Sequence, residues 1–218
     1  MPFRTVLFDL DGTLIDSIRL ILDSYHHTLA VHGLPGRTDA EWLAGIGTPL
    51  WVQFQKWSAD PQQLDQLIAT YREYNLAHHD AMVVAYPGVV EMMGVIHRAG
   101  LRTGLVTSKN RAGAQRGLRR IGLEHAIDLI VGADEVTHPK PHPEPVRIAL
   151  ERLAEVPERA IYIGDSVHDM ESGRAAGVTT GAVLWGPFGR EDLEATSPDH
   201  WLERPTDVLQ VLGLPYDS

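Results

Sequence analysis

Short apolar runs alternate with amphipathic stretches along much of this chain of 218 residues. Residues 6–8 form a continuous apolar run that ends at Asp9, a pattern that is typical of a strand buried on both faces. After residue 87 the alternation becomes regular. It predicts helices over 88–99, 111–121, 143–154 and 168–176, and strands over 102–107, 127–131, 160–164 and 179–185. Because helices that alternate with strands build right-handed βαβ units, we predict an α/β core with a doubly wound parallel sheet.

The segment before residue 87 has a different pattern, which is helical throughout. Asp16 or Ser17 is a suitable N-cap for a first helix, whose apolar residues recur at helical spacing until Gly33. Asp60-Pro61 begins another helix, which we extend to about residue 79. Nothing between residues 37 and 86 is typical of a strand. We therefore predict an all-helical segment over residues 17–86, called the helical insertion below.

The helical insertion divides the core in the sequence. We expect residues 1–16 and 87–218 to form one discontinuous catalytic domain, and residues 17–86 to form a second, smaller domain.

Three glycines lie between a predicted helix and the next predicted strand, which is the place of a helix C-cap: Gly100, Gly122 and Gly177.

Composition narrows the classes of function. The chain has 29 acidic and 19 basic residues, a net charge of −10, which argues against binding to nucleic acid. The same excess would repel an anionic substrate unless a cation intervened. Without any Cys there is no disulfide, thiolate metal site or cysteine nucleophile. No apolar run approaches the roughly 18 residues of a membrane span and no signal peptide is evident, so we expect a cytoplasmic protein without membrane contact.

Reactive side chains collect where the predicted strands end. In an open parallel sheet these ends meet at one edge, where ligands bind. Four carboxylates packed there would repel one another unless a hard cation lay among them, and oxygen ligands fit Mg²⁺. Lysine and hydroxyl groups would then hold a phosphoryl group beside the metal. The residues concerned are Asp9 and Asp11 after the first strand, then Thr107, Ser108 and Lys109, then Lys140, and finally Asp165 and Asp169.

Each of these features has an ordinary structural explanation when it is taken alone. Asp-Gly-Thr and Gly-Asp-Ser are common turn sequences, and Lys140 between two prolines suits a solvated loop. The chain has only three lysines, however, and two of them, Lys109 and Lys140, follow predicted strands at this edge. The combination in this order favours a functional site over four unrelated turns.

The same residues resemble the four motifs of the haloacid dehalogenase superfamily, which has a Rossmann-like core and, in this type, a helical cap inserted after the first motif. The resemblance implies that Asp9 is a nucleophile that accepts a phosphoryl group. Asp11 would protonate the leaving oxygen and then activate water. Mg²⁺ would be held by Asp9, the backbone carbonyl of Asp11 and Asp165, with Asp169 in support. Thr107 or Ser108, with Lys140, would steady the transferring oxygens.

Two positions separate branches of this superfamily. Haloacid dehalogenases and phosphonoacetaldehyde hydrolases lack the second Asp of the first motif, whereas Asp11 is present here, which favours a phosphate ester or anhydride as substrate. Sugar phosphomutases of this type carry a His where this chain has Ile21. Mutase activity is therefore disfavoured, although the nearby His26 and His27 leave it open.

The helical insertion is expected to select the substrate, because it would close over the leaving group. Along helix 61–79 an apolar face continues into Asn75, His78 and His79, which could point into the cleft or could face water near the hinge. The turn around Gly47 resembles the substrate-specificity loop of this branch.

A narrower resemblance is to the PpaX-type inorganic pyrophosphatases, neighbours of the phosphoglycolate phosphatases. It rests on the stretches 71–80, 140–145, 164–169 and 189–191. It implies that Arg72, His78 or His79 holds the second phosphate of pyrophosphate. The alternative substrate is phosphoglycolate or another small phosphorylated metabolite, and the chain would be a monomer or a homodimer.

An alternative of another class is a non-catalytic regulatory phospho-acceptor. Receiver-type α/β domains also gather an acidic cluster, Thr or Ser and Lys around Mg²⁺. They place the acceptor Asp on a middle strand and have no helical insertion, whereas the acidic pair here follows the first strand. Persistent phosphorylation of Asp9 without release of phosphate would favour this alternative.

Overall fold

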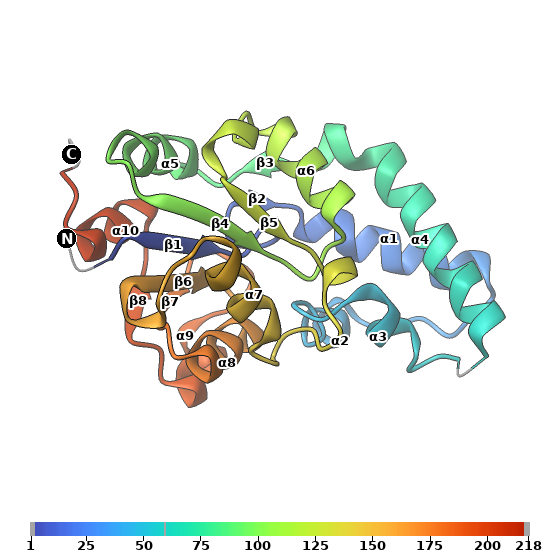
Figure 1. Cartoon of the computed structure of the whole chain (residues 1–218). Helices are drawn as coiled ribbons and strands as arrows, with labels where there is room; N and C mark the ends of the chain where they lie inside the picture. The colour runs from blue at the N-terminus through green and yellow to red at the C-terminus, as the bar shows by residue number, and fades with distance from the viewer. Residues whose placement is uncertain (1–2, 59, 216–218) are drawn as a thin grey trace.

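The central element is a six-stranded parallel sheet with the strand order β5-β4-β1-β6-β7-β8 (Figure 1). The computed structural model describes residues 3–58 and 60–215. The strands are β1 (Thr5–Phe8), β4 (Arg102–Val106), β5 (Leu129–Val131), β6 (Ala160–Gly164), β7 (Thr179–Val183) and β8 (His200–Leu202). The predicted doubly wound α/β core is confirmed, and β1 lies inside the sheet between β4 and β6.

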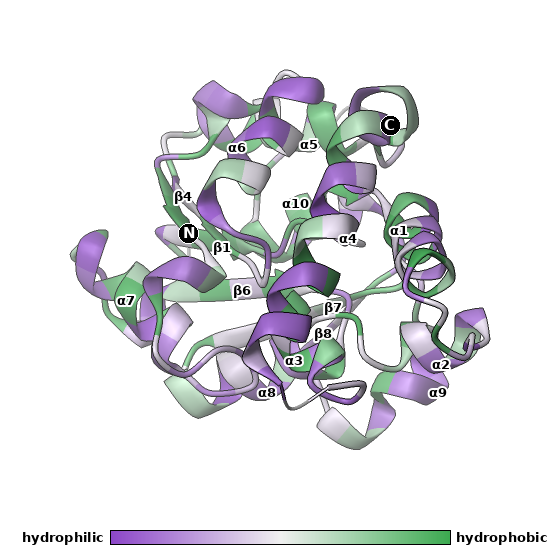
Figure 2. Ribbon diagram, turned by 90° about the vertical axis from the view of Figure 1, so that its right-hand side faces the viewer, coloured by the Kyte–Doolittle hydropathy of each residue, from purple (hydrophilic) through white to green (hydrophobic). Residues whose placement is uncertain are grey.

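Helices cover both faces of this sheet. One face packs against α5 (Val89–Arg98), α6 (Arg111–Arg120) and α10 (Pro205–Leu212), and the other against α7 (Glu144–Arg152) and α8 (Val167–Ala176), beside α9 (Arg190–Leu193). Short 3₁₀ helices occupy four connections: η1 (Glu124–Ala126), η2 (Ala133–Glu135), η3 (Pro157–Arg159) and η4 (Glu194–Thr196). Hydrophobic residues concentrate on the strands and the inner helix faces, and hydrophilic residues on the outer helix surfaces (Figure 2).

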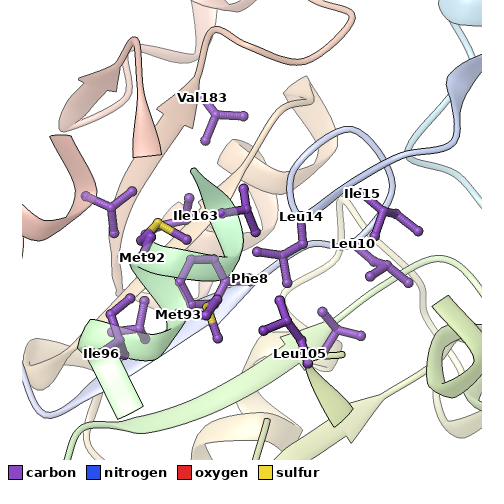
Figure 3. Packing of buried hydrophobic residues seen from close by; sticks show 14 of the residues in the cluster. Phe8, Leu10, Leu14, Ile15, Met92, Met93, Ile96, Leu105, Ile163 and Val183 are labelled. Carbon is purple, nitrogen blue, oxygen red and sulfur yellow. The ribbon is translucent and has the colours of Figure 1, made fainter. Parts of the chain in front are cut away.

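Alternation along β1 explains why the strand is fully buried. Val6 and Phe8 point into the cluster that includes α5, while Leu7 points into the cluster on the opposite face. Figure 3 shows Phe8 and Ile163 from adjacent strands close to Met92 and Met93 of α5. The continuous apolar run at residues 6–8 therefore has the structural basis that the sequence indicated.

Most predicted bounds agree with the structure to within about two residues. The three glycines predicted as helix C-caps, Gly100, Gly122 and Gly177, each have a positive φ, between 73° and 83°. The sequence patterns did not lead us to predict β8 and α10, which complete the sheet edge and one helical layer. Within residues 3–58 and 60–215, none of the helices has both the length and the apolar character needed to cross a membrane.

The helical insertion contains α1 (Ile18–Val31), α2 (Asp39–Leu43), α3 (Leu50–Phe54) and α4 (Pro61–Met82), which lie together at one end of the sheet (Figure 1). Its own core is aromatic, with Tyr25 stacked on Trp42 at a centroid distance of 4.0 Å.

The prediction that residues 37–86 contain no strand is wrong. Strand β3 (Val84–Ala85) pairs antiparallel with β2 (Ile15–Asp16), so the chain leaves and re-enters the core through a two-stranded ribbon. Two-residue strands are too short to produce an alternating pattern in the sequence. The division into two domains at residues 17 and 86 stays a prediction.

Candidate active site

The predicted polar residues do meet at the carboxyl edge of the sheet. Asp9 follows β1, Thr107 follows β4 and Asp165 follows β6, and these three strands are neighbours. Parallel pairing in register brings the three strand ends side by side. Asp9, Thr107 and Asp165 are all buried, so their polar groups must find partners within the protein or in a ligand.

Lys140 is the main partner of the buried carboxylates. Its Nζ lies 2.8 Å from Oδ1 of Asp9 and 2.6 Å from Oδ1 of Asp169, and its side chain is only 2% exposed. These two carboxylates raise the pKa of Lys140 above its usual value, although burial alone would lower it. Lys140 is therefore a fixed buried cation, and not the solvated loop lysine of the alternative interpretation.

Asp169 is held on both oxygens. Its Oδ1 accepts from Lys140 and from the Tyr162 hydroxyl at 2.7 Å, while its Oδ2 accepts from the backbone N–H and the hydroxyl of Ser166. Burial would raise the pKa of Asp169, but Lys140 and Ser166 hold it below its usual value. Asp169 thus orients Lys140, which fits the supporting role implied by the family resemblance.

Asp165 has a different environment. Its Oδ1 accepts from the Thr13 hydroxyl at 2.9 Å, whereas its buried Oδ2 has no hydrogen-bond partner among the described residues. Burial, and then the charges of Asp169 and Asp9, raise the pKa of Asp165 well above its usual range. Burial likewise raises the pKa of Asp9 to about 7, since Lys140 offsets it only in part.

These carboxylates fit a divalent cation. One oxygen from each of Asp9, Asp165 and Asp169 lies within 4.8 Å of the others. When all three are ionised, these carboxylates and the Lys140 ammonium together carry two negative charges, which one Mg²⁺ would neutralise. A cation here would also satisfy the orphaned Oδ2 of Asp165, and all-oxygen donors suit Mg²⁺. Gly12 (φ 93°) leaves room for this carboxylate, because a Cβ at that position would collide with Asp165.

Asp11 lies to one side of this cluster. Lys109 Nζ is 2.9 and 3.0 Å from the two Asp11 carboxylate oxygens, and the Ser17 hydroxyl donates to Oδ1 at 2.5 Å. Ser17, one of the two predicted N-cap candidates, is the residue before α1, but its side chain makes no capping bond to the helix. The Ser17 hydroxyl therefore bonds to the site residue Asp11 and not to the backbone of the helix.

A cavity of about 450 Å³ lies between this edge and the helical insertion. Asp9, Asp11, Thr107, Ser108 and Lys109 line its core side. On the other side, the predicted residues Gly47 and Arg72 line it together with Asn75 and several apolar or aromatic side chains, namely Ile21, Tyr25, Ile46, Leu50, Trp51, Ile68, Tyr71 and Leu76. The opposing wall is thus mainly apolar, and Arg72 is its one cationic side chain among the described residues.

Gly47 joins the two sides of the cavity. Its carbonyl accepts from the Ser108 hydroxyl at 2.5 Å, and its φ of 97° lies in the left-handed region. A Cβ there would lie 2.8 Å from the Ser166 hydroxyl and 2.9 Å from Cδ2 of His168. The turn can approach the core this closely because residue 47 has no side chain.

His78 and His79 do not line the cavity, in contrast to the expectation that they could contact substrate. His78 is exposed and stacks on Tyr74, and His79 is buried with its Nδ1 2.8 Å from Asp80. Asp80 in turn pairs with Arg116 of α6 at 3.0 Å. The residues of α4 that line the cavity end at Asn75 and Leu76, and the next turn of the helix does not reach it. His78 and His79 therefore lie beside the connection to the core.

Sequence reasoning missed Tyr162 and the role of Ser17. Tyr162 lies within an otherwise apolar strand, and its hydroxyl donates a hydrogen bond to Asp169. A tyrosine in a fully buried strand needs a polar partner, and that requirement was the available signal.

Comparison with known proteins agrees with this geometry. A family model described as haloacid dehalogenase-like hydrolase matches residues 6–183. The chain is 41% identical over 215 residues to pyrophosphatase PpaX of Anoxybacillus flavithermus, covering 98% of this chain and 99% of that protein. It is 42% identical to pyrophosphatase PpaX of Bacillus velezensis, with 96% of each covered. A solved haloacid dehalogenase-like family hydrolase from Streptococcus pneumoniae superposes with a TM-score of 0.82 at 28% identity, over 97% of this chain and 99% of the other.

Proposed function

The chain belongs to the haloacid dehalogenase-like hydrolase family, and from this premise we propose that it hydrolyses inorganic pyrophosphate through a phosphorylated Asp9. The observation that carries the proposal is Asp9 itself. This carboxylate lies at the end of β1, lines the cavity and is held through Oδ1 by the buried Lys140. Fixing one oxygen of a nucleophile aims the other at the substrate.

The proposed reaction has two steps. An oxygen of Asp9 attacks the nearer phosphorus, the bridging P–O bond breaks, and the second phosphate leaves. Water then attacks the phosphorus of phosphorylated Asp9 and gives one proton to Asp11, and the P–O bond to Asp9 breaks. This step releases phosphate, regenerates the Asp9 carboxylate and leaves Asp11 to return its proton to solvent. The Lys109 ammonium and the Ser17 hydroxyl donate to the Asp11 carboxyl group and hold it in position beside the cavity. A phosphate leaving group is itself a stable anion and demands less protonation than an alcohol.

Asp9 and Asp165 are the side chains that we propose hold Mg²⁺, with Asp169 supporting them through Lys140 and Ser166. When bound, the ion supplies positive charge that offsets the acidic residues and attracts the anionic substrate. The Thr107 hydroxyl would donate to the oxygens of the transferring phosphoryl group from the end of β4. Ser108 would do so only by giving up the hydrogen bond from its hydroxyl to the Gly47 carbonyl.

Arg72 is proposed to bind the leaving phosphate. It is the cationic side chain on the far wall of the cavity, whereas Lys109 is engaged by Asp11. The helical insertion would then act as a cap that brings Arg72 and the Gly47 turn over the core residues. Guanidinium groups match phosphate oxygens in a two-pronged geometry, which suits this role.

A substrate panel tests the proposal. With Mg²⁺ present, we expect a higher kcat/KM for pyrophosphate than for 2-phosphoglycolate or other small phosphomonoesters. Asp9→Asn should lower turnover at least about a thousandfold, since it removes the nucleophile. Faster hydrolysis of 2-phosphoglycolate would overturn the substrate assignment. A wild-type rate in Asp9→Asn would overturn the nucleophile, provided that thermal unfolding shows the variant to be folded.

A further inference from the structure

A second cluster of metal-ligating side chains lies outside the active site, in the connection between η2 and α7 and at the first residue of α7. One imidazole nitrogen from each of His138 and His142 and one carboxylate oxygen of Glu144 lie within 4.8 Å of one another. His138 Nδ1 is 2.6 Å from Oε2 of Glu144, and the two imidazole rings are 4.7 Å apart. The proposed reaction makes no use of these side chains.

The carboxylate of Glu144 is already fixed in position. Its Oε1 accepts from the backbone N–H of Thr137 at 2.7 Å, and its Oε2 accepts from the backbone N–H of His138 at 3.1 Å. On the other side, the Ser172 hydroxyl of α8 donates to the His142 carbonyl at 2.8 Å. The backbone therefore holds the three ligand groups close together, so a metal would have little chain ordering to impose.

We propose that His138, His142 and Glu144 bind a divalent transition metal, with Zn²⁺ as the representative ion. Two imidazoles and one carboxylate are donors that such metals prefer, whereas Mg²⁺ prefers oxygen ligands. The metal would take the place of the hydrogen bond between His138 Nδ1 and Glu144 Oε2. Side-chain exposures of 62% for His138 and 49% for His142 leave the remaining coordination positions open to water.

The position of this site relative to Lys140 gives the metal a structural effect. His138 and His142 lie two residues before and two residues after Lys140. A metal that joins them would close the loop that places Lys140 between Asp9 and Asp169. Because it binds the folded loop and not the unfolded chain, Zn²⁺ should stabilise the protein.

Zn²⁺ binding to the full chain tests the proposal. The protein is freed of metal and then kept in excess Mg²⁺, and Zn²⁺ binding is measured by calorimetry and equilibrium dialysis in the wild type and in Asp165→Asn. We expect one equivalent of Zn²⁺ in both proteins, with shifted imidazole NMR signals for His138 and His142. Zn²⁺ should also raise the unfolding temperature. His138→Ala and His142→Ala should each weaken binding by at least about tenfold, since even outer partners of metal ligands contribute that much.

The matched control is His125→Ala. His125 is also exposed and pairs with a glutamate, Glu124, at 3.3 Å, but among the described residues it belongs to no cluster of three metal-ligating side chains. This variant should bind Zn²⁺ like the wild type, and His142→Cys should restore binding because a thiolate is a zinc ligand. The proposal is overturned if Asp165→Asn abolishes all Zn²⁺ binding, or if both alanine variants bind with unchanged affinity. Neither result would bear on pyrophosphate hydrolysis, which the substrate panel tests separately.

Discussion

Two lysines make similar ion pairs at the active site in different surroundings. Lys140 is 2% exposed between Asp9 and Asp169, while the side chain of Lys109 is 16% exposed beside Asp11. Removing one member of a buried ion pair leaves an uncompensated charge, whereas a partly solvated pair is screened by water. The energetic importance of each lysine therefore depends on its burial and not on its distance to the carboxylate.

We predict that Lys140→Met lowers the free energy of unfolding by about 3–5 kcal/mol in metal-free buffer, and Lys109→Met by about 1 kcal/mol or less. Urea unfolding followed by circular dichroism measures both values. Equal losses in the two variants would contradict the assignment of Lys140 as the buried cation of the site.

Arg72→Gln should raise the KM for pyrophosphate by roughly tenfold or more, because it removes the cation proposed to bind the leaving phosphate. Arg19→Gln is the matched control: Arg19 is also an exposed arginine of the helical insertion, but it pairs with Asp23 and does not line the cavity. Steady-state kinetics distinguishes the two variants. An equal effect of both substitutions would show that the overall charge of the insertion matters and not the position of Arg72.

At the scale of the elements, Gly47 determines how closely the turn between α2 and α3 approaches the core. We predict that Gly47→Ala lowers kcat/KM at least about tenfold, because the new methyl group would meet Ser166 and His168 and the backbone has a positive φ. Gly33→Ala is the control: Gly33 also has a positive φ, of 63°, but no atom lies within 4 Å of its added Cβ.

Thermal unfolding and kinetics together separate these effects. The free energy of unfolding should fall by about 1 kcal/mol in both variants, because alanine adopts a positive φ less readily than glycine. Only Gly47→Ala should lose activity. A Gly33→Ala variant that loses as much activity would indicate that strain anywhere in the insertion is sufficient.

The sequence was informative where elements are long or follow one another regularly. Asp9, Thr107 and Asp165 could be assigned to one site because each follows an apolar strand, and parallel strands end at the same edge. The ribbon of β2 and β3 could not be predicted, because two residues have no periodicity. His78 and His79 keep the helical phase of Asn75, but their distance from the cavity depends on how α4 meets α6, which no local pattern contains.

At the scale of the whole molecule, the net charge of −10 first argues against an anionic substrate. The structure places three acidic residues, Asp9, Asp165 and Asp169, in one buried cluster with a single lysine. The net charge of the chain therefore does not describe the site once a divalent cation is bound. Without a bound cation the core side of the cavity lacks the positive charge that would attract phosphate, so pyrophosphate should not bind in the presence of EDTA.

We predict that Mg²⁺ stabilises the whole protein by binding to the cluster of Asp9, Asp165 and Asp169. A ligand at 100 times its Kd contributes about 2.7 kcal/mol, which corresponds to a rise in Tm of roughly 5–10 °C for a chain of this size. Asp165→Asn removes the carboxylate whose Oδ2 has no hydrogen-bond partner among the described residues, so it should abolish this rise. Without Mg²⁺ the variant should be at least as stable as the wild type, because the amide removes the cost of burying a carboxyl group beside Asp9 and Asp169. Differential scanning calorimetry measures the unfolding temperature of the wild type and of Asp165→Asn, each with Mg²⁺ and with EDTA. An equal effect of Mg²⁺ in both proteins would exclude Asp165 as a ligand.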